Sequence, residues 1–168
     1  LHAIPIATYV FAQILRSIKS IDAHIELQRE KSWKQMMSVG ELTDMTIGIT
    51  GFGGIGQEVA RLAKAFRMNV FATKRTPVVS DNLDQLFKPS ELDKMLPLCD
   101  FVVNCLPSSD ETYKVFSKSR FDLMKTSSMF INVGRGESVD EVSLAEALQE
   151  KMIPVSYTHL RAHETHND

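Results

Sequence analysis

The chain has 168 residues, which is enough for one domain with a sizeable core and too few for two ordinary domains. Its hydrophobic content of 43%, its charged content of 24% and its net charge of −2 are typical of a soluble globular protein. The basic residues form no stripe and no apolar stretch is long enough to span a bilayer, so we expect neither a nucleic-acid partner nor a membrane partner.

Residues 1–40 are predicted to form a helix followed by a connector. Apolar residues recur at helical spacing from Ile6 onward, and Pro5 suits the first turn of such a helix. The segment does not resemble a secretory signal, because it lacks a positively charged leading region and a small-residue cleavage site. The polar stretch 24–42 is interpreted as the connector, in which Trp33 makes a subunit contact.

Beyond residue 40, short β-rich runs alternate with helical patterns. We expect strands at 45–50, 69–73, 100–106 and 129–133, and helices at 57–66, 90–96, 118–124 and 140–151. Strands that alternate with helices indicate a parallel sheet covered on both faces. The sequence therefore predicts an α/β fold, a Rossmann-type doubly wound parallel sheet, in a dinucleotide-binding domain of residues 41–153.

A glycine-rich loop joins the first strand of this domain to its first helix. Gly51, Gly53 and Gly56 form the pattern G-x-G-x-x-G in the stretch GFGGIG. In this setting the first glycine permits a tight turn, the second lets a pyrophosphate approach the backbone, and the third allows close packing of helix and strand. Amide groups at the start of the helix would face the anion. The residues predicted to bind the cofactor here are Gly51, Phe52, Gly53, Gly54, Ile55 and Gly56. A glycine-rich turn without a ligand is the alternative.

The end of the second strand decides which nicotinamide cofactor fits. Thr73 is followed by Lys74 and Arg75, and no carboxylate appears before Asp81. An acid at this place would bind the ribose hydroxyls of NAD, whereas an arginine can pair with a 2′-phosphate through two hydrogen bonds. We therefore predict that Thr73, Lys74 and Arg75 contact the cofactor, with NADP preferred and NAD possible. Alternatively, the two cations are solvated charges at a strand end.

Four motifs extend well beyond the glycine loop. They are GFGGIGQEVARLAKAFRMNV, CDFVVNCLPSSDETYKVF, SRFDLMK and FINVGRGESVDEVSLAEAL. From about His2 to Ile153 the chain thereby resembles the NAD(P)-dependent D-isomer-specific 2-hydroxyacid dehydrogenases, which include glyoxylate/hydroxypyruvate reductases and phosphoglycerate dehydrogenases. The resemblance implies a cofactor domain inserted into a substrate domain, a homodimer joined through the cofactor domain, and an inter-domain role for residues 1–40.

Arg135 lies between two glycines directly after an apolar run, in the stretch FINVGRGESVDE. The resemblance implies that it is the catalytic arginine, which binds the substrate carboxylate and polarises the neighbouring carbonyl. A guanidinium group suits this task because it is planar, stays charged and can grip a carboxylate with two hydrogen bonds. Gly134 and Gly136 would let the backbone approach the cofactor. The alternative is that Arg135 pairs with a nearby acid.

The resemblance also implies cofactor contacts in two further loops. The residues are Cys105, Leu106, Pro107 and Thr112, with Val133 and Gly134 on the nicotinamide side. Leu106 and Pro107 could instead simply end a strand, and Thr112 could cap a helix. No metal site is predicted.

Cysteine usage bears on the compartment. Cys99 and Cys105 are too few for a disulfide framework, and Cys105 lies in an apolar run. A reduced, cytoplasmic compartment fits this pattern best.

The regular pattern stops after Ile153, where the sequence reads PVSYTHLRAHETHND. This stretch resembles one reading frame of a sequencing adaptor, so residues 154–168 are interpreted as a non-native tail. A tail that binds a metal through its histidines is the alternative. On the first interpretation the sheet is truncated before its last strands, and the strand at 129–133 has an unpaired edge that favours aggregation.

The leading hypothesis is a fragment of an oxidoreductase. Because the chain begins at Leu1, we expect a longer parent enzyme that transfers hydride between NAD(P)H and the 2-carbon of a small 2-oxo or 2-hydroxy acid, and an inactive fragment. A histidine and a glutamate that exchange the proton are expected outside the family-like residues. One alternative is an NAD(H)-sensing binding module of the corepressor type without catalysis. A more distant one is the NAD domain of a hydrolase. The sequence does not identify the acid.

Overall fold

The computed structural model describes residues 2–34 and 39–158. Its strands are β1 (Thr46–Thr50), β2 (Asn69–Thr73), β3 (Gln85–Phe87), β4 (Phe101–Asn104), β5 (Met129–Asn132) and β6 (Val155–Thr158). Its α-helices are α1 (Ala3–Ile18), α2 (Ile21–Arg29), α3 (Gly54–Ala65), α4 (Leu92–Met95), α5 (Lys118–Phe121) and α6 (Glu141–Gln149). The short 3₁₀ helices are η1 (Pro89–Glu91), η2 (Leu96–Leu98) and η3 (Gly136–Ser138).

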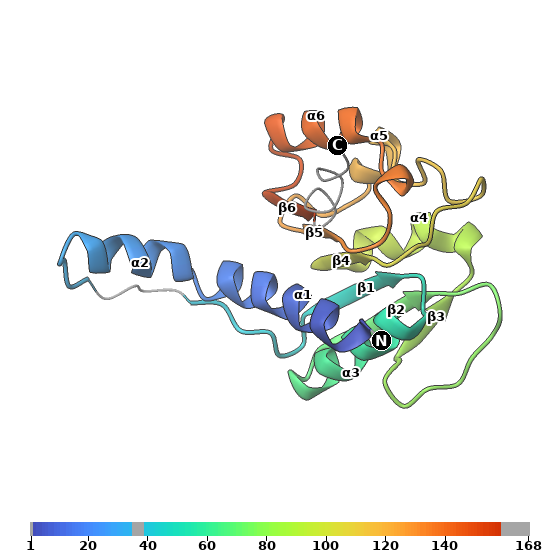
Figure 1. The fold of residues 1–168 in the computed structure, drawn as a ribbon, viewed down its shortest axis with the longest axis horizontal. Coiled ribbons are helices and arrows are strands. Elements are labelled where there is room, and N and C mark those ends of the chain that lie inside the picture. Colours follow the sequence, from blue (N-terminus) through green and yellow to red (C-terminus); the bar gives the residue numbers. More distant parts are fainter. Residues whose placement is uncertain (1, 35–38, 159–168) are drawn as a thin grey trace, which may run out of the picture.

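The described strands form one parallel sheet in the order β3-β2-β1-β4-β5-β6, with helices on both of its faces (Figure 1). The first strand, β1, lies in the middle of the sheet; the next two are added outward to β3, and the chain then crosses to β4 and adds strands outward on the other side. The prediction of a Rossmann-type doubly wound sheet is confirmed. In such a sheet, ligands bind outside the carboxyl ends of the strands, where the winding direction changes.

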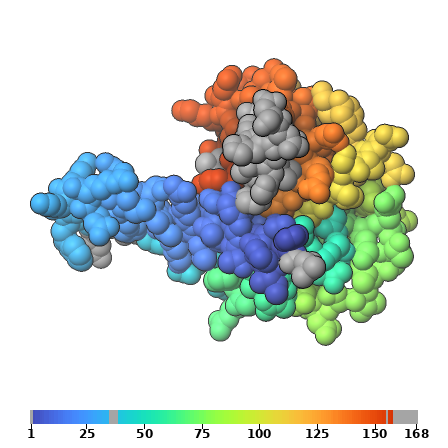
Figure 2. Space-filling model, in the orientation of Figure 1, coloured from blue at the N-terminus to red at the C-terminus, as the bar shows by residue number. Residues whose placement is uncertain are grey.

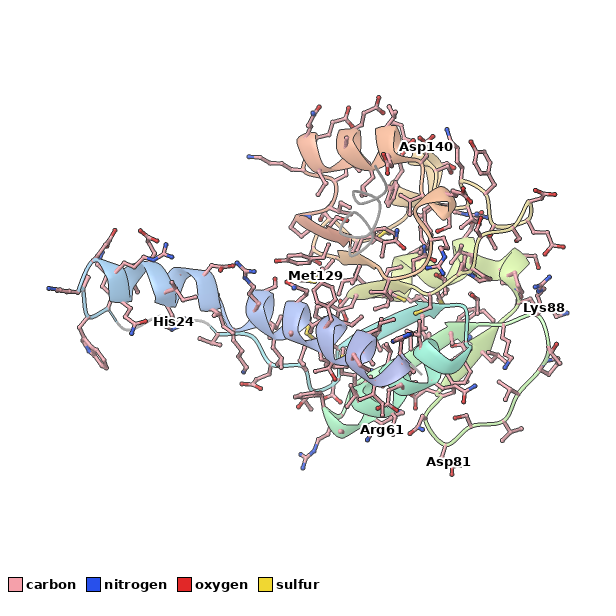
Figure 3. All side chains as sticks on the ribbon, in the orientation of Figure 1. His24, Arg61, Asp81, Lys88, Met129 and Asp140 are labelled. Atoms are coloured by element: carbon pink, nitrogen blue, oxygen red, sulfur yellow. The ribbon has the colours of Figure 1, made fainter. Side chains whose placement is uncertain are left out.

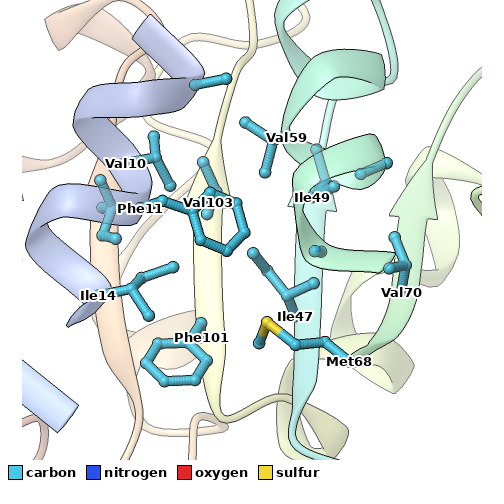
Figure 4. Close-up of a cluster of buried hydrophobic side chains, with 14 of the residues drawn as sticks. Val10, Phe11, Ile14, Ile47, Ile49, Val59, Met68, Val70, Phe101 and Val103 are labelled. Atoms are coloured by element: carbon cyan, nitrogen blue, oxygen red, sulfur yellow. The ribbon is translucent and has the colours of Figure 1, made fainter. Parts of the chain in front are cut away.

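Successive residues of each strand point to opposite faces of the sheet. Ile47 and Ile49 of β1 lie on the face that α1 and α3 cover (Figure 4). Figure 4 shows Val10, Phe11 and Ile14 of α1 packed against this face, where Phe11 also stacks on Phe66 with 5.2 Å between ring centroids.

The second face is covered by α4, α5 and α6. Val102 of β4 and Phe130 of β5 pack there among residues of these helices. Phe130 lies 5.3 Å from Phe121 and 4.8 Å from Phe116 between ring centroids. Two buried faces explain why the strands read as continuous apolar runs rather than alternating ones.

Two expectations about local structure were wrong. The stretch 24–42 was expected to be a connector, but it contains most of α2. This helix lies outside the core, and none of its residues is buried, so the sequence shows no apolar stripe there although most of its residues favour helices. The helix expected at 90–96 is instead divided into η1, α4 and η2, since Pro89 and Pro97 each begin a new turn.

The expectation of an unpaired edge at 129–133 was also wrong. β6 pairs with β5 in parallel, with Ile131 opposite Tyr157, and Tyr157 packs against the core cluster on the α1 side. The β-branched and aromatic residues of VSYT fit a strand. This pairing does not bear on the origin of residues 154–168, and the histidines of that tail lie outside the described residues.

α2 extends away from the sheet at one end of the molecule, whereas α1, which precedes it, packs against the sheet (Figure 2). Ser20 separates the two helices in a left-handed conformation with φ of 50°. Within residues 2–34 and 39–158, no helix is long and apolar enough to cross a membrane.

The packing on the second face predicts the effect of adding one methyl group. A Cβ at Gly48 would lie 2.5 Å from Sγ of Cys99 and 3.1 Å from Cε of Met95. We expect Gly48→Ala to lower the free energy of unfolding by about 1–3 kcal/mol, because overpacking a filled core forces its neighbours apart. Urea denaturation followed by circular dichroism measures this change.

Gly136→Ala is the matched control, since in the described part of the chain no heavy atom beyond its two neighbours in sequence lies within 4 Å of the methyl group it would add. It should change the free energy of unfolding by about 0.5 kcal/mol or less. Equal effects of the two substitutions would contradict the packing described for Gly48.

Candidate functional site

The glycine loop follows β1 at the carboxyl edge of the sheet. Gly51 has φ of +89°, a conformation that side chains rarely adopt. A Cβ at Gly56 would clash with the carbonyl oxygen of Gly51, so this glycine allows α3 to pack against the turn. Both predicted reasons for these two glycines are present in the structure.

Gly53 and Gly54 face open space. Within residues 2–34 and 39–158, no heavy atom other than the adjoining backbone lies within 4 Å of the position of a Cβ at either residue, and both are exposed. Gly53 caps α3, which begins at Gly54 rather than at residue 57 as expected. The first amide groups of α3 therefore have no partner within the helix and open onto this space. The arrangement fits a pyrophosphate, which needs close backbone approach and amide donors.

The remaining residues of the loop contribute differently. Phe52 is 2% exposed and packs in the core, so its ring cannot reach a ligand. Ile55 is partly buried in the first turn of α3.

The end of β2 is tied to the glycine loop. The Gly51 amide donates to Oγ1 of Thr73 at 3.3 Å, and the Phe52 amide donates to the Thr73 carbonyl at 3.2 Å. Nζ of Lys74 donates to the Phe52 carbonyl at 3.1 Å and lies 5.9 Å from the centre of the Phe52 ring. Thr73 and Lys74 thus hold the loop in place. Arg75 points elsewhere, and its Nη1 lies 2.8 Å from Oε2 of Glu111.

The loop after β4, which contains Cys105 and Thr112, forms another part of the candidate site. Burial raises the pKa of the Cys105 thiol to about 12, so it is protonated at neutral pH and is not a nucleophile. Oγ1 of Thr112 donates to the Pro107 carbonyl at 2.6 Å and accepts from the Ser109 amide at 2.9 Å. The hydroxyl that was expected to reach the cofactor is therefore used to shape its own loop.

A row of buried polar side chains crosses the sheet at this edge. Thr50, Asn104 and Asn132 occupy matching register positions in β1, β4 and β5. The Thr50 hydroxyl donates to Oδ1 of Asn104 at 2.9 Å. Nδ2 of Asn104 donates to Oδ1 of Asn132 at 2.9 Å and to Oγ of Ser138 at 2.6 Å. The Leu106 amide also donates to Oδ1 of Asn104, at 3.2 Å.

Arg135 has a fixed backbone and a free side chain. Its amide donates to the Leu106 carbonyl at 3.2 Å, and its carbonyl accepts from the Ser138 hydroxyl at 2.6 Å. Its guanidinium group is exposed and has no hydrogen bond or ion pair within residues 2–34 and 39–158. In the described part of the chain, therefore, no acid forms the structural pair with Arg135 that was the alternative.

Packing requires a glycine at position 134, a reason that the sequence did not indicate. A Cβ there would lie 2.5 Å from the carbonyl oxygen of Leu106, so the turn that carries Arg135 packs directly on the loop after β4. That loop also contacts Gly51, whose Cβ would lie 3.2 Å from the Cys105 carbonyl oxygen. The glycine loop and the Arg135 turn therefore meet on the same two residues. Val133, buried at 5% exposure, directly follows β5.

Figure 3 labels two acidic residues, Asp81 in the loop between β2 and β3 and Asp140 at the start of α6. No cluster of histidine, cysteine, aspartate and glutamate that could hold a metal is found in the residues that the structure describes.

Sequence reasoning missed Asn104, Ser138 and Glu111. A signal for Asn104 existed, because FVVN and FINV each place an asparagine within or directly after a buried run. A polar residue in such a place needs a partner, and two neighbouring strands can supply it to each other. Nothing in the sequence indicates that Glu111 pairs with Arg75, 36 residues away.

Comparisons with known proteins agree with this geometry. A family model described as "D-isomer specific 2-hydroxyacid dehydrogenase, NAD binding domain" matches residues 11–164. A glyoxylate reductase from Thermococcus onnurineus is 40% identical over 129 residues, which cover 75% of this chain and 38% of the relative.

Two solved structures have the same fold. The phosphoglycerate dehydrogenase from Lactobacillus plantarum is 29% identical with a TM-score of 0.87, over 99% of this chain and 54% of that one. An NADPH-dependent glyoxylate/hydroxypyruvate reductase from Sinorhizobium meliloti, in complex with NADP and sulfate, is 25% identical with a TM-score of 0.82, over 96% of this chain and 53% of that one.

The chain spans 38% of the length of the curated relative and about half of each solved structure. The glycine loop, the strands of the sheet and the Arg135 turn all lie within the matched residues 11–164. The match over residues 11–164 shows that the chain belongs to the D-isomer specific 2-hydroxyacid dehydrogenase family, to whose NAD-binding domain these residues correspond.

Proposed function

We propose that this chain is the cofactor-binding part of an enzyme that reduces a small 2-oxo acid, such as glyoxylate or hydroxypyruvate, to the corresponding 2-hydroxy acid, which has the D configuration where the 2-carbon becomes a stereocentre. The observation that carries the proposal is the guanidinium group of Arg135. It is exposed, has no partner among the described residues, and rises from a turn that touches the same loop as the glycine turn.

Arg135 can hold the carboxylate of the acid. A free guanidinium group binds a carboxylate through two parallel hydrogen bonds, which fixes both distance and orientation. Because the Arg135 backbone is anchored to Leu106 and Ser138, the bound acid has a defined position relative to the cofactor loop. Such positioning lowers the barrier without any covalent step by this residue.

The cofactor cradle consists of the open backbone at Gly53 and Gly54 and the first amides of α3. A bound nicotinamide dinucleotide would supply the hydride that reduces the 2-carbon. The thiol of Cys105, with its pKa raised by burial to about 12, offers no competing nucleophile.

We further propose that NADP is preferred and that NAD is possible. Arg75 is the exposed cation that follows β2, whereas the ammonium group of Lys74 is occupied by the Phe52 carbonyl. The Sinorhizobium meliloti relative carries NADP, which supports the same choice.

The carboxylate role predicts a loss of activity in the full gene product, which includes the substrate domain. We expect Arg135→Gln to lower kcat/KM for glyoxylate by roughly 100-fold, because two charge-assisted hydrogen bonds worth about 3 kcal/mol together are lost. Arg135→Lys keeps the charge but not the fork, so it should restore only part of the activity. NADPH oxidation followed at 340 nm measures both variants.

The dissociation constant for NADPH is the internal control and should stay within about twofold for both variants. Wild-type turnover by Arg135→Gln would contradict the proposal. Cofactor binding without turnover of any 2-oxo acid by the wild-type protein would favour a sensing module instead.

The cofactor preference predicts a selective effect of Arg75→Ala. We expect NADPH affinity to fall about tenfold and NADH affinity to stay within about twofold, because only NADPH has the 2′-phosphate that Arg75 would bind. Isothermal titration of the chain with each dinucleotide gives the two constants. Lys88→Ala, which removes an exposed cation after β3, is the matched control and should leave the NADPH/NADH ratio unchanged.

A homodimer in the cytoplasm completes the proposal. The exposed helix α2 supports it, because α2 buries none of its residues within the chain and a nine-residue helix alone is marginal in water. Trp33, 96% exposed just beyond α2, is a suitable anchor for a partner subunit. Both cysteines are free, which fits a reduced compartment.

The homodimer predicts that Trp33→Ala weakens self-association. We expect the dimer dissociation constant to rise at least tenfold, since a large aromatic side chain would lose its contact. Analytical ultracentrifugation across a concentration series measures it. Val79→Ala is the control, because Val79 is 99% exposed in the loop after β2. A wild-type protein that stays monomeric at all concentrations would contradict the homodimer.

A further inference from the structure

One ion pair crosses the carboxyl edge of the sheet above the glycine loop. Arg75 follows β2 and Glu111 lies in the loop after β4, and these two strands flank β1 on opposite sides. The distance from Nη1 of Arg75 to Oε2 of Glu111 is 2.8 Å. The pair therefore bridges the end of β1, where the glycine turn begins.

The two side chains differ in how they are supported. Glu111 belongs to a loop that Thr112 braces through its hydrogen bonds to Pro107 and Ser109. The side chain of Arg75 is 74% exposed, and Glu111 is its partner among the described residues. Arg75 can thus swing away by rotation of its own side chain, while the carboxylate is presented from a braced loop.

This geometry makes Glu111 a competitor for the group that Arg75 would bind. A 2′-phosphate monoester carries close to two negative charges at neutral pH and three acceptor oxygens. To bind Arg75, the 2′-phosphate must displace the Glu111 carboxylate. The bound phosphate then lies near this carboxylate, which repels it. NADH carries no phosphate at this position, so the competition does not arise for it.

We propose that Glu111 is a specificity-determining residue of the cofactor site: it clasps Arg75 across the end of β1 and thereby limits the preference for NADP that Arg75 provides. The inference rests on the proposed role of Arg75. It explains how a site with an arginine after β2 can still accept NAD, since the clasp lowers only the affinity for the phosphorylated cofactor.

The expected size of the effect follows from the exposure of the pair. Glu111 is 72% exposed, so solvent screens the interaction strongly. Exposed ion pairs change equilibria by about two- to fivefold, and the effect shrinks as salt is added. A change of this size is measurable by titration and would shift the choice of cofactor without abolishing binding.

The test compares Glu111→Gln with wild type in titrations of the 168-residue chain with NADPH and NADH. We expect Glu111→Gln to bind NADPH about two- to fivefold more tightly and NADH unchanged, with the gain decreasing at higher salt. Asp110→Asn is the matched control, because it removes the same charge from the neighbouring exposed residue. Thermal unfolding of each variant checks that the fold is retained.

The double variant with Arg75→Ala and Glu111→Gln isolates the pair. If Glu111 acts through Arg75, the gain seen for Glu111→Gln disappears when Arg75 is absent. A gain that persists without Arg75, or one that Asp110→Asn matches, would overturn the inference.

The same measurements separate two kinds of failure. If Arg75→Ala leaves the ratio of the NADPH and NADH dissociation constants unchanged, the proposed role of Arg75 is wrong. Glu111 then has no bound phosphate with which to compete for Arg75. If Arg75→Ala lowers NADPH affinity while Glu111→Gln matches Asp110→Asn, only the inference about Glu111 fails. Binding of neither dinucleotide by the wild-type chain contradicts both.

Discussion

The hydrogen-bonded row of Thr50, Asn104 and Asn132 is the constraint on which the site depends. These three polar side chains are at most 2% exposed, so each must find a partner within the protein. They find one another because their strands are paired in matching register. A slip of one residue would move a polar group to the opposite face of the sheet, among the apolar residues that α1 and α3 cover. The row thereby fixes where each strand ends and each loop begins.

Fixed strand ends let two turns meet with little freedom. Gly51 and Gly134 both pack against residues 105 and 106: a Cβ at Gly134 would lie 2.5 Å from the Leu106 carbonyl oxygen, and one at Gly51 would lie 3.2 Å from the Cys105 carbonyl oxygen. Ser138 then connects the polar row to the carbonyl of Arg135. The result is a rigid backbone that carries exposed charged groups, an arrangement that suits binding because the anchor points are set before a ligand arrives.

The sequence was most informative where local chemistry and tertiary structure agree. The glycine pattern and the alternation of strands and helices predicted the sheet and the sharp turn after its first strand, because turn geometry and burial directly affect which residues occur at each position. It was least informative where structure forms without burial or in very short elements. α2 buries nothing, β3 has three residues, and β6 lies in a stretch whose composition pointed to another origin.

Lys74 and Arg75 show why residue type alone could not assign the cofactor contacts. Both are cations that follow the same strand, and the sequence offers no reason to distinguish them. In the structure, Lys74 donates to the Phe52 carbonyl, so its ammonium group stabilises the loop. Among the residues that the structure describes, Arg75 is held by one exposed carboxylate, that of Glu111, which a stronger anion can replace. Whether a charged residue can bind a ligand depends on the interactions within the protein that it must break to do so. The free energy of breaking them is set by partners that are distant in sequence.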